Sequence, residues 1–416
     1  MTAGASWADG SKRHRVVVAG GGVAGVEALL GLHELAGETV ELTLVSSAPD
    51  FVNRPLLVEE PFTVQPAERR ELAPLAASLG AEFVQRSLAS VDADRREAVL
   101  DDGARIPYDS LVVCVGASTT PAFSAALTFP SPLGPFRIDD VLAQEEDGMR
   151  IAFIIPAGVG WALPMYELAL MTKRRGRERH EDRVGCTIVT PESAPLSIFG
   201  TAVSDAVAKL LSARGVEIEL GAYVRESAPG VLVVLPADRE LEAEAVISLP
   251  LLEGPRIPGL PCDEEGFLPI DEHARVDGLD GVYAAGDGAA FPIKQGGIGA
   301  QQADAAAEHI ARRAGADVTP APFRPVLRGE LMTGADPLHM RHEVAGGEGE
   351  GMASEGYLWW PPQKIVSRYV SGWLARTGSG EEPEAPSPSV DVEVALPREW
   401  HVDPAAFDPY GPLSDR

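Results

Sequence analysis

The chain has 416 residues, of which 45% are hydrophobic, so it is long enough for two or three packed domains of an ordinary globular kind. Its 62 acidic and 35 basic residues give a formal net charge of -27, which argues against binding to nucleic acid, because phosphate backbones attract basic surfaces. No apolar run reaches the ~18 residues that a membrane helix needs, and the N-terminal residues lack the apolar segment of a secretory signal. We therefore expect a cytoplasmic protein, with peripheral contact to the inner face of the membrane left open.

A glycine-rich turn near the N-terminus follows a short apolar run. Residues 16–19 are apolar and β-branched, which predicts a buried parallel strand. Gly20, Gly22 and Gly25 then complete the pattern G-x-G-x-x-G, and leucines at helical spacing follow. In such a unit the first glycine makes the turn, the second admits a pyrophosphate to the backbone, and the third lets helix and strand pack closely. The helix N-terminus adds oriented N–H groups, so this segment predicts a nucleotide site.

The second predicted strand, residues 40–47, departs from this pattern at its end. A dinucleotide site normally has an acidic residue there, which holds the ribose hydroxyls. This chain has Ser46 and Ser47 at that point, and Asp50 is the nearest acid. We interpret Ser46 as a cofactor ligand whose hydrogen bond is weaker than that of a carboxylate.

A third strand is predicted within residues 108–119, and it ends at Gly116. The strand contains Cys114, which we interpret as a buried core thiol. Cys186 begins a later strand, Cys262 lies in a loop, and no two of the three cysteines form C-x-x-C. The spacing therefore predicts neither a zinc site nor a redox pair, although folding can bring distant thiols together.

Another strand is predicted at residues 282–285, far along the chain. Gly286 and Asp287 end it, and a glycine-rich loop then opens an alanine-rich helix near Gly297. A carboxylate at the carboxyl end of a strand can bind a hydroxyl-rich ligand in the crevice above a parallel sheet. The helix N-terminus directs N–H groups at a negatively charged ring. We expect these residues to share one site with the first glycine turn.

Three stretches together resemble the two-dinucleotide-fold flavoproteins: VVVAGGGVAGVEA, YDSLVVCVGAS and GVYAAGDGAAFP. The resemblance covers about residues 14–315 and implies FAD as the cofactor. It implies that Gly20, Gly22 and Gly25 hold the pyrophosphate. It implies that Asp287 binds the ribityl chain and the flavin-side phosphate region. Two further stretches, APDFVNRPLL and FPIKQGGIGAQQADAAA, are similar to sulfide:quinone oxidoreductases and type II NADH dehydrogenases.

Four side chains are candidates for chemistry at the flavin. Lys294, in a loop expected to border it, either stabilises the anionic reduced flavin or is a solvated lysine. Glu167 either relays protons to a reduced quinone or is a structural helix residue. Gln301 and Gln302 resemble a glutamine-containing segment that lines the quinone pocket of type II NADH dehydrogenases. The spacing matches only in part, and the alternative is a capping or solvated role.

Residues 151–165 begin like a second nucleotide-binding unit but do not complete the glycine pattern. Alignment on the following helix places three residues at the glycine positions: Gly160, Ala162 and Met165. Met165 puts a long side chain where helix and strand touch, and Trp161 fills the space that a pyrophosphate would enter. Glu192, near the end of the next strand, is either a ribose ligand, a capping residue or a solvated acid. We expect a half-domain that is retained for architecture and does not bind NAD(P)H in the usual pose.

The C-terminal third predicts two strands, an amphipathic helix and a tail. The strands lie within residues 321–351, and in residues 363–376 apolar side chains recur at helical spacing beside three basic ones. This segment is compatible with contact to a membrane interface, or with packing on the flavin domain or on a second subunit as in a homodimer. The residues that follow are rich in Pro, Ser and Glu, which is typical of a flexible tail.

The sequence as a whole predicts an α/β protein with two Rossmann-like three-layer FAD/NAD(P)-binding domains, of which the FAD domain is discontinuous, and a small C-terminal α+β region. The predicted units are a flexible N-terminus (1–13), two parts of an FAD-binding domain (14–148 and 251–320), an NAD(P)-binding-like domain (149–250), a C-terminal interface region (321–376) and a Pro/Glu-rich tail (377–416).

We expect an FAD-dependent oxidoreductase that passes electrons through bound flavin to a quinone or similar acceptor, as in sulfide:quinone oxidoreductases. The small-molecule electron donor is left open. Two alternatives remain: an NAD(P)H:quinone dehydrogenase similar to type II NADH dehydrogenases, and a non-catalytic flavin-binding partner or redox-sensing protein. The sequence predicts no metal site and no nucleic-acid partner.

Overall fold

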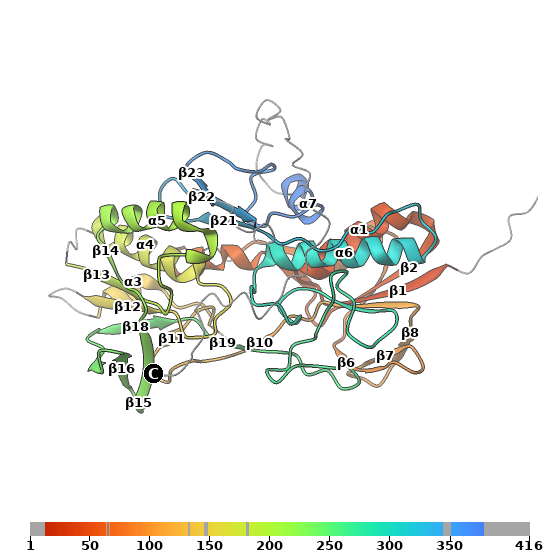
Figure 1. The fold of residues 1–416 in the computed structure, drawn as a ribbon, viewed down its shortest axis with the longest axis horizontal. Coiled ribbons are helices and arrows are strands. Elements are labelled where there is room, and N and C mark those ends of the chain that lie inside the picture. The colour runs from red at the N-terminus through yellow and green to blue at the C-terminus, as the bar shows by residue number, and fades with distance from the viewer. Residues whose placement is uncertain are drawn as a thin grey trace, which may run out of the picture.

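The computed structural model describes residues 13–63, 65, 67–131, 134–144, 149–179, 183–343 and 351–377. Two parallel sheets lie side by side along the long axis of the molecule, and a small antiparallel sheet lies above the point where they meet (Figure 1). This arrangement confirms the predicted α/β architecture with two Rossmann-like units. The predicted flexible segments, 1–13 and 377–416, lie outside the described residues except for Arg13 and Thr377.

The first sheet carries the predicted FAD-binding motifs. Its strand order is β20-β9-β1-β2-β5, and all neighbouring strands are parallel. The strands are β1 (His14–Ala19), β2 (Val40–Val45), β5 (Glu82–Val84), β9 (Ser110–Val113) and β20 (Val282–Ala284). The strand order reverses between β1 and β9, and ligands of open parallel sheets bind outside the carboxyl ends at such a point. The glycine turn after β1 and the loop after β20 therefore meet at one edge of the sheet.

Two long helices cover one face of this sheet, and an antiparallel sheet covers the other (Figure 1). The helices α1 (Val23–Ala36) and α6 (Gly296–Arg313) pack side by side. Small residues permit this close approach, because a Cβ added at Gly31 would lie 3.3 Å from the Cβ of Ala307. The opposite face is covered by β6 (Leu88–Asp92), β7 (Glu97–Leu100) and β8 (Arg105–Pro107).

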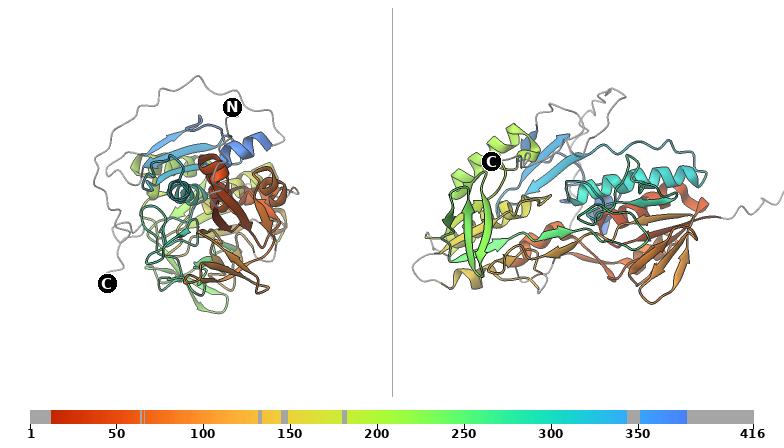
Figure 2. Two further views of the ribbon diagram at one scale, coloured as in Figure 1. Left: turned by 90° about the vertical axis from the view of Figure 1, so that its right-hand side faces the viewer. Right: turned by 60° about the horizontal axis from the view of Figure 1, so that its bottom comes forward.

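The second sheet has the order β11-β18-β12-β13-β14, again with parallel neighbours. Its strands are β11 (Leu127–Thr128), β12 (Arg150–Ile154), β13 (Gly185–Val189), β14 (Val216–Glu219) and β18 (Ala245–Ser248). Figure 2 shows this unit from two further sides, with helices on one face and an antiparallel sheet on the other. These layers are α4 (Leu163–Glu178), α5 (Thr201–Arg214), β15 (Tyr223–Ala228), β16 (Val231–Leu235) and β17 (Arg239–Glu240).

Shorter elements complete the two units and connect them. The strand pairs are β3 (Asp50–Val52) with β4 (Arg69–Glu71), and β10 (Ser118–Thr120) with β19 (Leu251–Glu253). The helical elements are η1 (Gly37–Thr39), η2 (Arg54–Phe62), α2 (Leu72–Ser78), α3 (Ile138–Leu142) and η3 (Ser197–Phe199). The β10–β19 pair joins the chain that leaves the first unit to the chain that returns from the second.

The C-terminal region contains one antiparallel sheet and one helix. The sheet consists of β21 (Val326–Leu331), β22 (Leu338–Glu343) and β23 (Met352–Ser354), so the two predicted strands are confirmed. The helix α7 (Val370–Thr377) begins seven residues later than the apolar periodicity predicts, so a helix from Gln363 is wrong. The reason is a tertiary cap: the backbone N–H groups of Tyr369 and Val370 donate to the carboxylate of Glu27 at 2.8 and 2.6 Å.

The apolar face of α7 is buried in protein. Val370 and Leu374 are at most 1% exposed, and the Trp373 ring meets Phe51 edge to face with centroids 5.3 Å apart. Packing on the first unit thus accounts for the periodicity, and this apolar face is not available to a membrane interface. Within the described residues, no helix is both long enough and apolar enough to cross a bilayer.

Two carboxyl groups are buried where α7 meets the first unit. Glu27 of α1 is fully buried, and Asp304 of α6 is largely buried beside it. Burial, together with the nearby Glu27 carboxylate, raises the pKa of Asp304 to about 9. The folded protein therefore favours the neutral form of Asp304.

We expect Asp304→Asn to stabilise the protein at pH 8 and to have a smaller effect at pH 4. A raised folded-state pKa gives stability that is complete below the unfolded value of about 3.9 and is lost as the pH rises through about 9. Asparagine cannot ionise, so we expect a melting temperature about 3 °C or more above the parent at pH 8. Differential scanning calorimetry across this range, with Asp205→Asn on an exposed face of α5 as the control, tests the sign. A gain of equal size at both pH values would contradict it.

Candidate functional site

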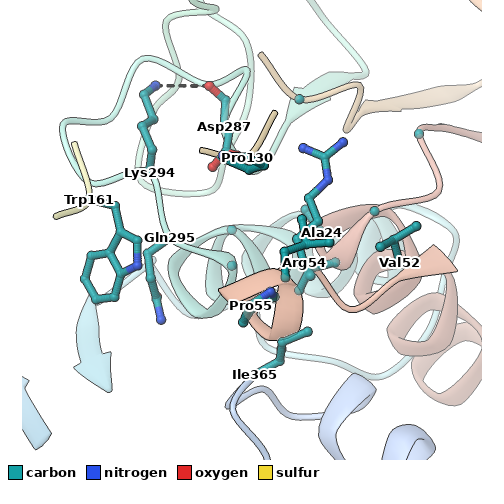
Figure 3. A pocket seen from close by; sticks show the side chains of 18 of the residues that line it. Ala24, Val52, Arg54, Pro55, Pro130, Trp161, Asp287, Lys294, Gln295 and Ile365 are labelled. Carbon is teal, nitrogen blue, oxygen red and sulfur yellow. Dashed lines mark hydrogen bonds between the residues drawn. The ribbon is translucent and has the colours of Figure 1, made fainter. Parts of the chain in front are cut away.

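A cavity of about 610 Å³ lies at the carboxyl ends of the first sheet (Figure 3). The loop between β12 and α4 and the strand β21 close its other sides. Nine of the ten residues that the sequence predicts for the site line this cavity: Gly20, Gly22, Ser46, Gly116, Glu167, Gly286, Asp287, Lys294 and Gly297. The exception is Gly25, which packs behind the glycine turn.

Each of the three glycines of the first turn is needed for a different structural reason. Gly20 has φ +124°, and an added Cβ would lie 2.1 Å from the carbonyl oxygen of Cys114. A Cβ at Gly25 would lie 1.8 Å from the carbonyl oxygen of Gly20, so this position serves the helix–strand contact. A Cβ at Gly22 would meet nothing within 4 Å, and no side chain caps α1 there. Open space and uncapped N–H groups are what an incoming phosphate needs.

Ser46 lies at the end of β2, where the sequence lacks the usual acid. Its hydroxyl donates to the carbonyl oxygen of Ala48 at 2.9 Å, and the residue is buried at the cavity wall. The lone pairs of the hydroxyl remain available to accept a hydrogen bond. Ser47 and Asp50 line the same side of the cavity.

Asp287 and Lys294 lie on one loop after β20 (Figure 3). The carboxylate of Asp287 has no hydrogen-bond partner among the described residues, and burial raises its pKa. Lys294 Nζ donates to the backbone oxygens of Asp287 and Ala289 at 3.1 and 2.6 Å and lies 3.6 Å from the centre of the Phe267 ring. Burial lowers the pKa of Lys294 to about 8. The loop thus presents an unpaired carboxylate and a fixed positive charge to the cavity.

Glu167 and Lys364 form an ion pair in the cavity wall. The distance from Lys364 Nζ to Glu167 Oε1 is 2.6 Å, and the two side chains are 6% and 1% exposed. The same oxygen accepts the backbone N–H of Met332 at 3.0 Å. Burial raises the pKa of Glu167, while the Lys364 ammonium opposes this shift. The carboxyl group of Glu167 is therefore buried in the cavity wall with a pKa above its ordinary value.

Several cavity residues were missed by the sequence analysis. Arg54, at the start of η2, extends beside Ala24 of α1 (Figure 3). The sequence contained a signal for Arg54, because this residue lies within the APDFVNRPLL stretch that carries the family likeness. Lys364 and Arg328 also line the cavity, but nothing in their local sequence indicates a partner or a site.

The glutamines at the start of α6 have structural roles. Gln301 donates to the carbonyl oxygens of Gly297 and Val326 and accepts the N–H of Val326. Gln302 accepts the N–H of Gly286 at 2.9 Å. Neither lines the cavity, so their resemblance to a quinone-binding segment does not describe their contacts. Gln295, which caps α6 by accepting the N–H of Ile298, lines it instead.

The second glycine loop is built against the first unit. A Cβ at Gly160 would lie 2.4 Å from the carbonyl oxygen of Pro292, and its own carbonyl oxygen accepts the N–H of Lys294. Trp161 contacts Phe199 with ring centroids 5.8 Å apart, and Met165 is fully buried. Gly160 therefore serves the contact between the two loops.

Side chains of the protein fill the space after β13, where the ribose of a bound nucleotide would lie. Glu192 is buried and accepts hydrogen bonds from Tyr166 Oη at 2.6 Å and Thr190 Oγ1 at 3.0 Å. Burial raises the pKa of Glu192 to about 7. Glu192 is therefore not a solvated acid, and its carboxylate also accepts from the backbone of Ser197 at the start of η3.

All three cysteines are described, and none forms a disulfide. Cys114 and Cys186 are buried in different hydrophobic clusters, and burial raises the pKa of each to about 12. Cys262 is exposed on a loop, and Cys114 alone of the three lines the cavity. The geometry therefore brings no two thiols together at the site.

Comparison with known proteins shows the family. The profile of the pyridine nucleotide-disulphide oxidoreductases matches residues 14–309. An NADH dehydrogenase-like protein of Mycobacterium tuberculosis is 28% identical over 295 residues, which cover 66% of this chain and 73% of the relative. The demethylphylloquinone reductase of Synechocystis sp. is 26% identical over 306 residues, which cover 67% and 72%. The structure of the sulfide:quinone oxidoreductase of Aquifex aeolicus has a TM-score of 0.73 at 20% identity, covers 82% of this chain and 86% of that chain, and shows a common fold.

The residues in the cavity fit FAD, the cofactor of this family. The open space at Gly22 and the uncapped start of α1 suit a pyrophosphate, and the unpaired carboxylate of Asp287 suits a polyhydroxyl chain. The chain belongs to the pyridine nucleotide-disulphide oxidoreductase family, as an FAD-dependent oxidoreductase related to quinone-reducing flavoproteins.

Proposed function

We propose that this protein passes electrons through its FAD from a small-molecule donor to a quinone. FAD, when bound, takes up two electrons from the donor and gives them to the acceptor. The observation that carries the proposal is the buried Glu167–Lys364 pair in the wall of the cavity.

Reduction of a quinone to a hydroquinone consumes two protons, so an acceptor that enters a cavity needs a proton donor there. Glu167 supplies this group, because its carboxyl lies in the cavity wall and burial raises its pKa above the ordinary value. Lys364 orients Glu167 and compensates its charge once the proton has left. A protein electron carrier that accepts one electron without a proton would make no use of this pair.

The cofactor is held, in this proposal, by residues from three distant parts of the chain. Gly22 and the start of α1 face the pyrophosphate, and Arg54 beside them adds positive charge. Lys294 lies where it stabilises negative charge on the reduced ring. The proposed cofactor ligands are Gly20, Gly22, Ser46, Gly116, Gly286, Asp287 and Gly297, and Gly25 supports the turn from behind.

The proposal is tested by anaerobic mixing of the dithionite-reduced protein with a quinone such as menadione. We expect the absorption of oxidised flavin to return within the mixing experiment. A purified protein that contains no FAD and does not bind added FAD, or a reduced protein that quinones do not oxidise, would contradict the proposal.

NAD(P)H is a second candidate for the donor, since the relative from Mycobacterium tuberculosis is named NADH dehydrogenase-like. The buried Met165 and the Glu192–Tyr166 hydrogen bond argue against the usual pose of this nucleotide. A parallel anaerobic screen with sulfide, NADH and NADPH decides the donor. Bleaching of the flavin by NADH or NADPH would favour the dehydrogenase, and no turnover with any donor–acceptor pair would favour a non-catalytic flavoprotein.

We expect Lys294→Met to lower the midpoint potential of the bound flavin by about 30 mV, which corresponds to about 1.4 kcal/mol for a two-electron couple. The ammonium group favours the reduced, more negative form of the ring, and methionine removes that charge. Above pH 8, where Lys294 loses its proton, the difference should shrink. Spectroelectrochemical titration measures it, with Lys173→Met as the control, because Lys173 bonds the carbonyl oxygen of Val184 in the second unit. Equal potentials for the parent and Lys294→Met would rule out this role.

A further inference from the structure

Five basic side chains line the cavity within the described part of the chain. Lys294, Lys364 and Arg86 already donate to backbone oxygens or carboxylates. The other two, Arg54 and Arg328, have no hydrogen-bond or ion-pair partner among the described residues. Arg54 is exposed to solvent, so its lack of a partner costs little, whereas Arg328 is half-buried and its missing partner needs an explanation.

The cofactor accounts for Arg54 but not for Arg328. Arg54 lines the cavity together with Ala24 of α1, and its positive charge acts on the carboxylate of Asp287, a proposed cofactor ligand. Arg328 lines the cavity from β21, and its backbone oxygen accepts from Gln295 Nε2, the side chain that caps α6. It therefore reaches the cavity from the C-terminal sheet, on the same wall as Glu330.

The register of the C-terminal sheet places a second positive charge against Arg328. Arg341 of β22 lies directly opposite it, and like charges in that relation are destabilising. Burial and this neighbour lower the pKa of Arg328. The nearby acid Glu343 offsets this effect only in part, and its Oε1 accepts from Arg341 at 3.0 Å. An anion bound at Arg328 would offset the repulsion between the two arginines and would supply the missing partner.

We propose that Arg328 binds an anionic group on the quinone that accepts the electrons. The substrate class is an acidic quinone, whose ring carries a carboxylate, a sulfonate or an ionised hydroxyl group. The planar guanidinium fork matches two oxygens of such a group. Glu330, two residues further along the same face of β21, disfavours an anion at its own position and restricts the group to the Arg328 end. This inference rests on the proposed function.

The test compares a charged and a neutral quinone on the purified flavoprotein. Naphthoquinone sulfonate and menadione are titrated at equilibrium, and the dissociation constant is read from the perturbed flavin absorption. Arg328→Gln should raise the dissociation constant of the sulfonate about tenfold or more. It should raise that of menadione less than about threefold. Arg328→Lys, which keeps the charge, should recover part of the loss. Arg341→Gln is the matched control, and it should change the sulfonate constant much less than Arg328→Gln does, because the Arg341 side chain is 42% exposed and pairs with Glu343.

The outcomes separate this inference from the proposed function. If Arg328→Gln weakens the binding of both quinones equally, or does not weaken the binding of the sulfonate, the proposed anionic subsite is wrong. A parent protein that binds and reduces menadione but does not bind the sulfonate would overturn it too, while quinone reduction would stand. If neither quinone oxidises the reduced parent protein, the proposed function fails, and the subsite fails with it. Flavin content and melting temperature verify that each variant is folded.

Discussion

Replacement of Glu167 by glutamine is expected to slow the oxidation of the reduced protein by a quinone about 100-fold, and to leave its oxidation by ferricyanide within about twofold. Glutamine preserves the size of the side chain but holds no exchangeable acid proton. Hydroquinone formation needs protons, whereas ferricyanide takes one electron and no proton. Anaerobic stopped-flow measurement of flavin absorption with each acceptor separates the two effects.

The control for this experiment is a second buried glutamate away from the cavity. Glu192 also has a raised pKa, and it bonds Tyr166 and Thr190 in the second unit. We expect both acceptors to oxidise the reduced Glu192→Gln variant at the same rate as the parent protein. Because Glu167→Gln leaves the Lys364 ammonium without its buried partner, its melting temperature should fall, and flavin content must be checked. Equal losses with quinone and ferricyanide would show a structural role for Glu167 instead of proton transfer.

Alanine at Gly22 is expected to weaken the binding of FAD, whereas alanine at Gly25 is expected to lower the stability of the fold. Gly22→Ala should fold with an unchanged melting temperature as apoprotein, because its φ is -84° and an added Cβ meets no atom within 4 Å. The new methyl group would project into space that the pyrophosphate needs, so the dissociation constant for FAD should rise about 100-fold. Gly25→Ala places Cβ 1.8 Å from the carbonyl oxygen of Gly20, so it should lower the free energy of unfolding by about 3 kcal/mol or more.

Apoprotein melting and equilibrium titration with FAD measure the two effects separately. Gly80→Ala does not serve as a neutral control, because Gly80 has φ +66°. Gly185→Ala is suitable, since Gly185 lies in β13 and an added Cβ would meet its first neighbour at 3.6 Å. If Gly22→Ala binds FAD as tightly as the parent, the first glycine turn is not the pyrophosphate site.

The fold was largely predictable because its determinants are local. Strands β1, β9 and β20 are short, mostly buried apolar runs with glycines shortly after them, and such runs are typical of parallel sheets covered on both faces. The turn at Gly20 requires a positive φ, which glycine adopts without strain. Periodicity failed at residues 363–369, because the carboxylate of Glu27, far away in sequence, decides where α7 begins.

The candidate site was predictable only in part. Nine of the ten predicted residues line one cavity, since the carboxyl ends of parallel strands meet at one edge. Their partners were not predictable, because the chain supplies them from elsewhere. Glu167 meets Lys364 across 197 positions of sequence, and no local pattern relates the two.

By itself, then, the sequence determined the two Rossmann-like units, the glycine turn and the residues at the strand ends, because each depends on short apolar runs and on the residues next to them. Only the tertiary structure decided which acid faces a lysine. It also decided that Arg328 reaches the cavity with Arg341 opposite it. These are distances and charges between distant segments, and they exist only after the sheets have packed.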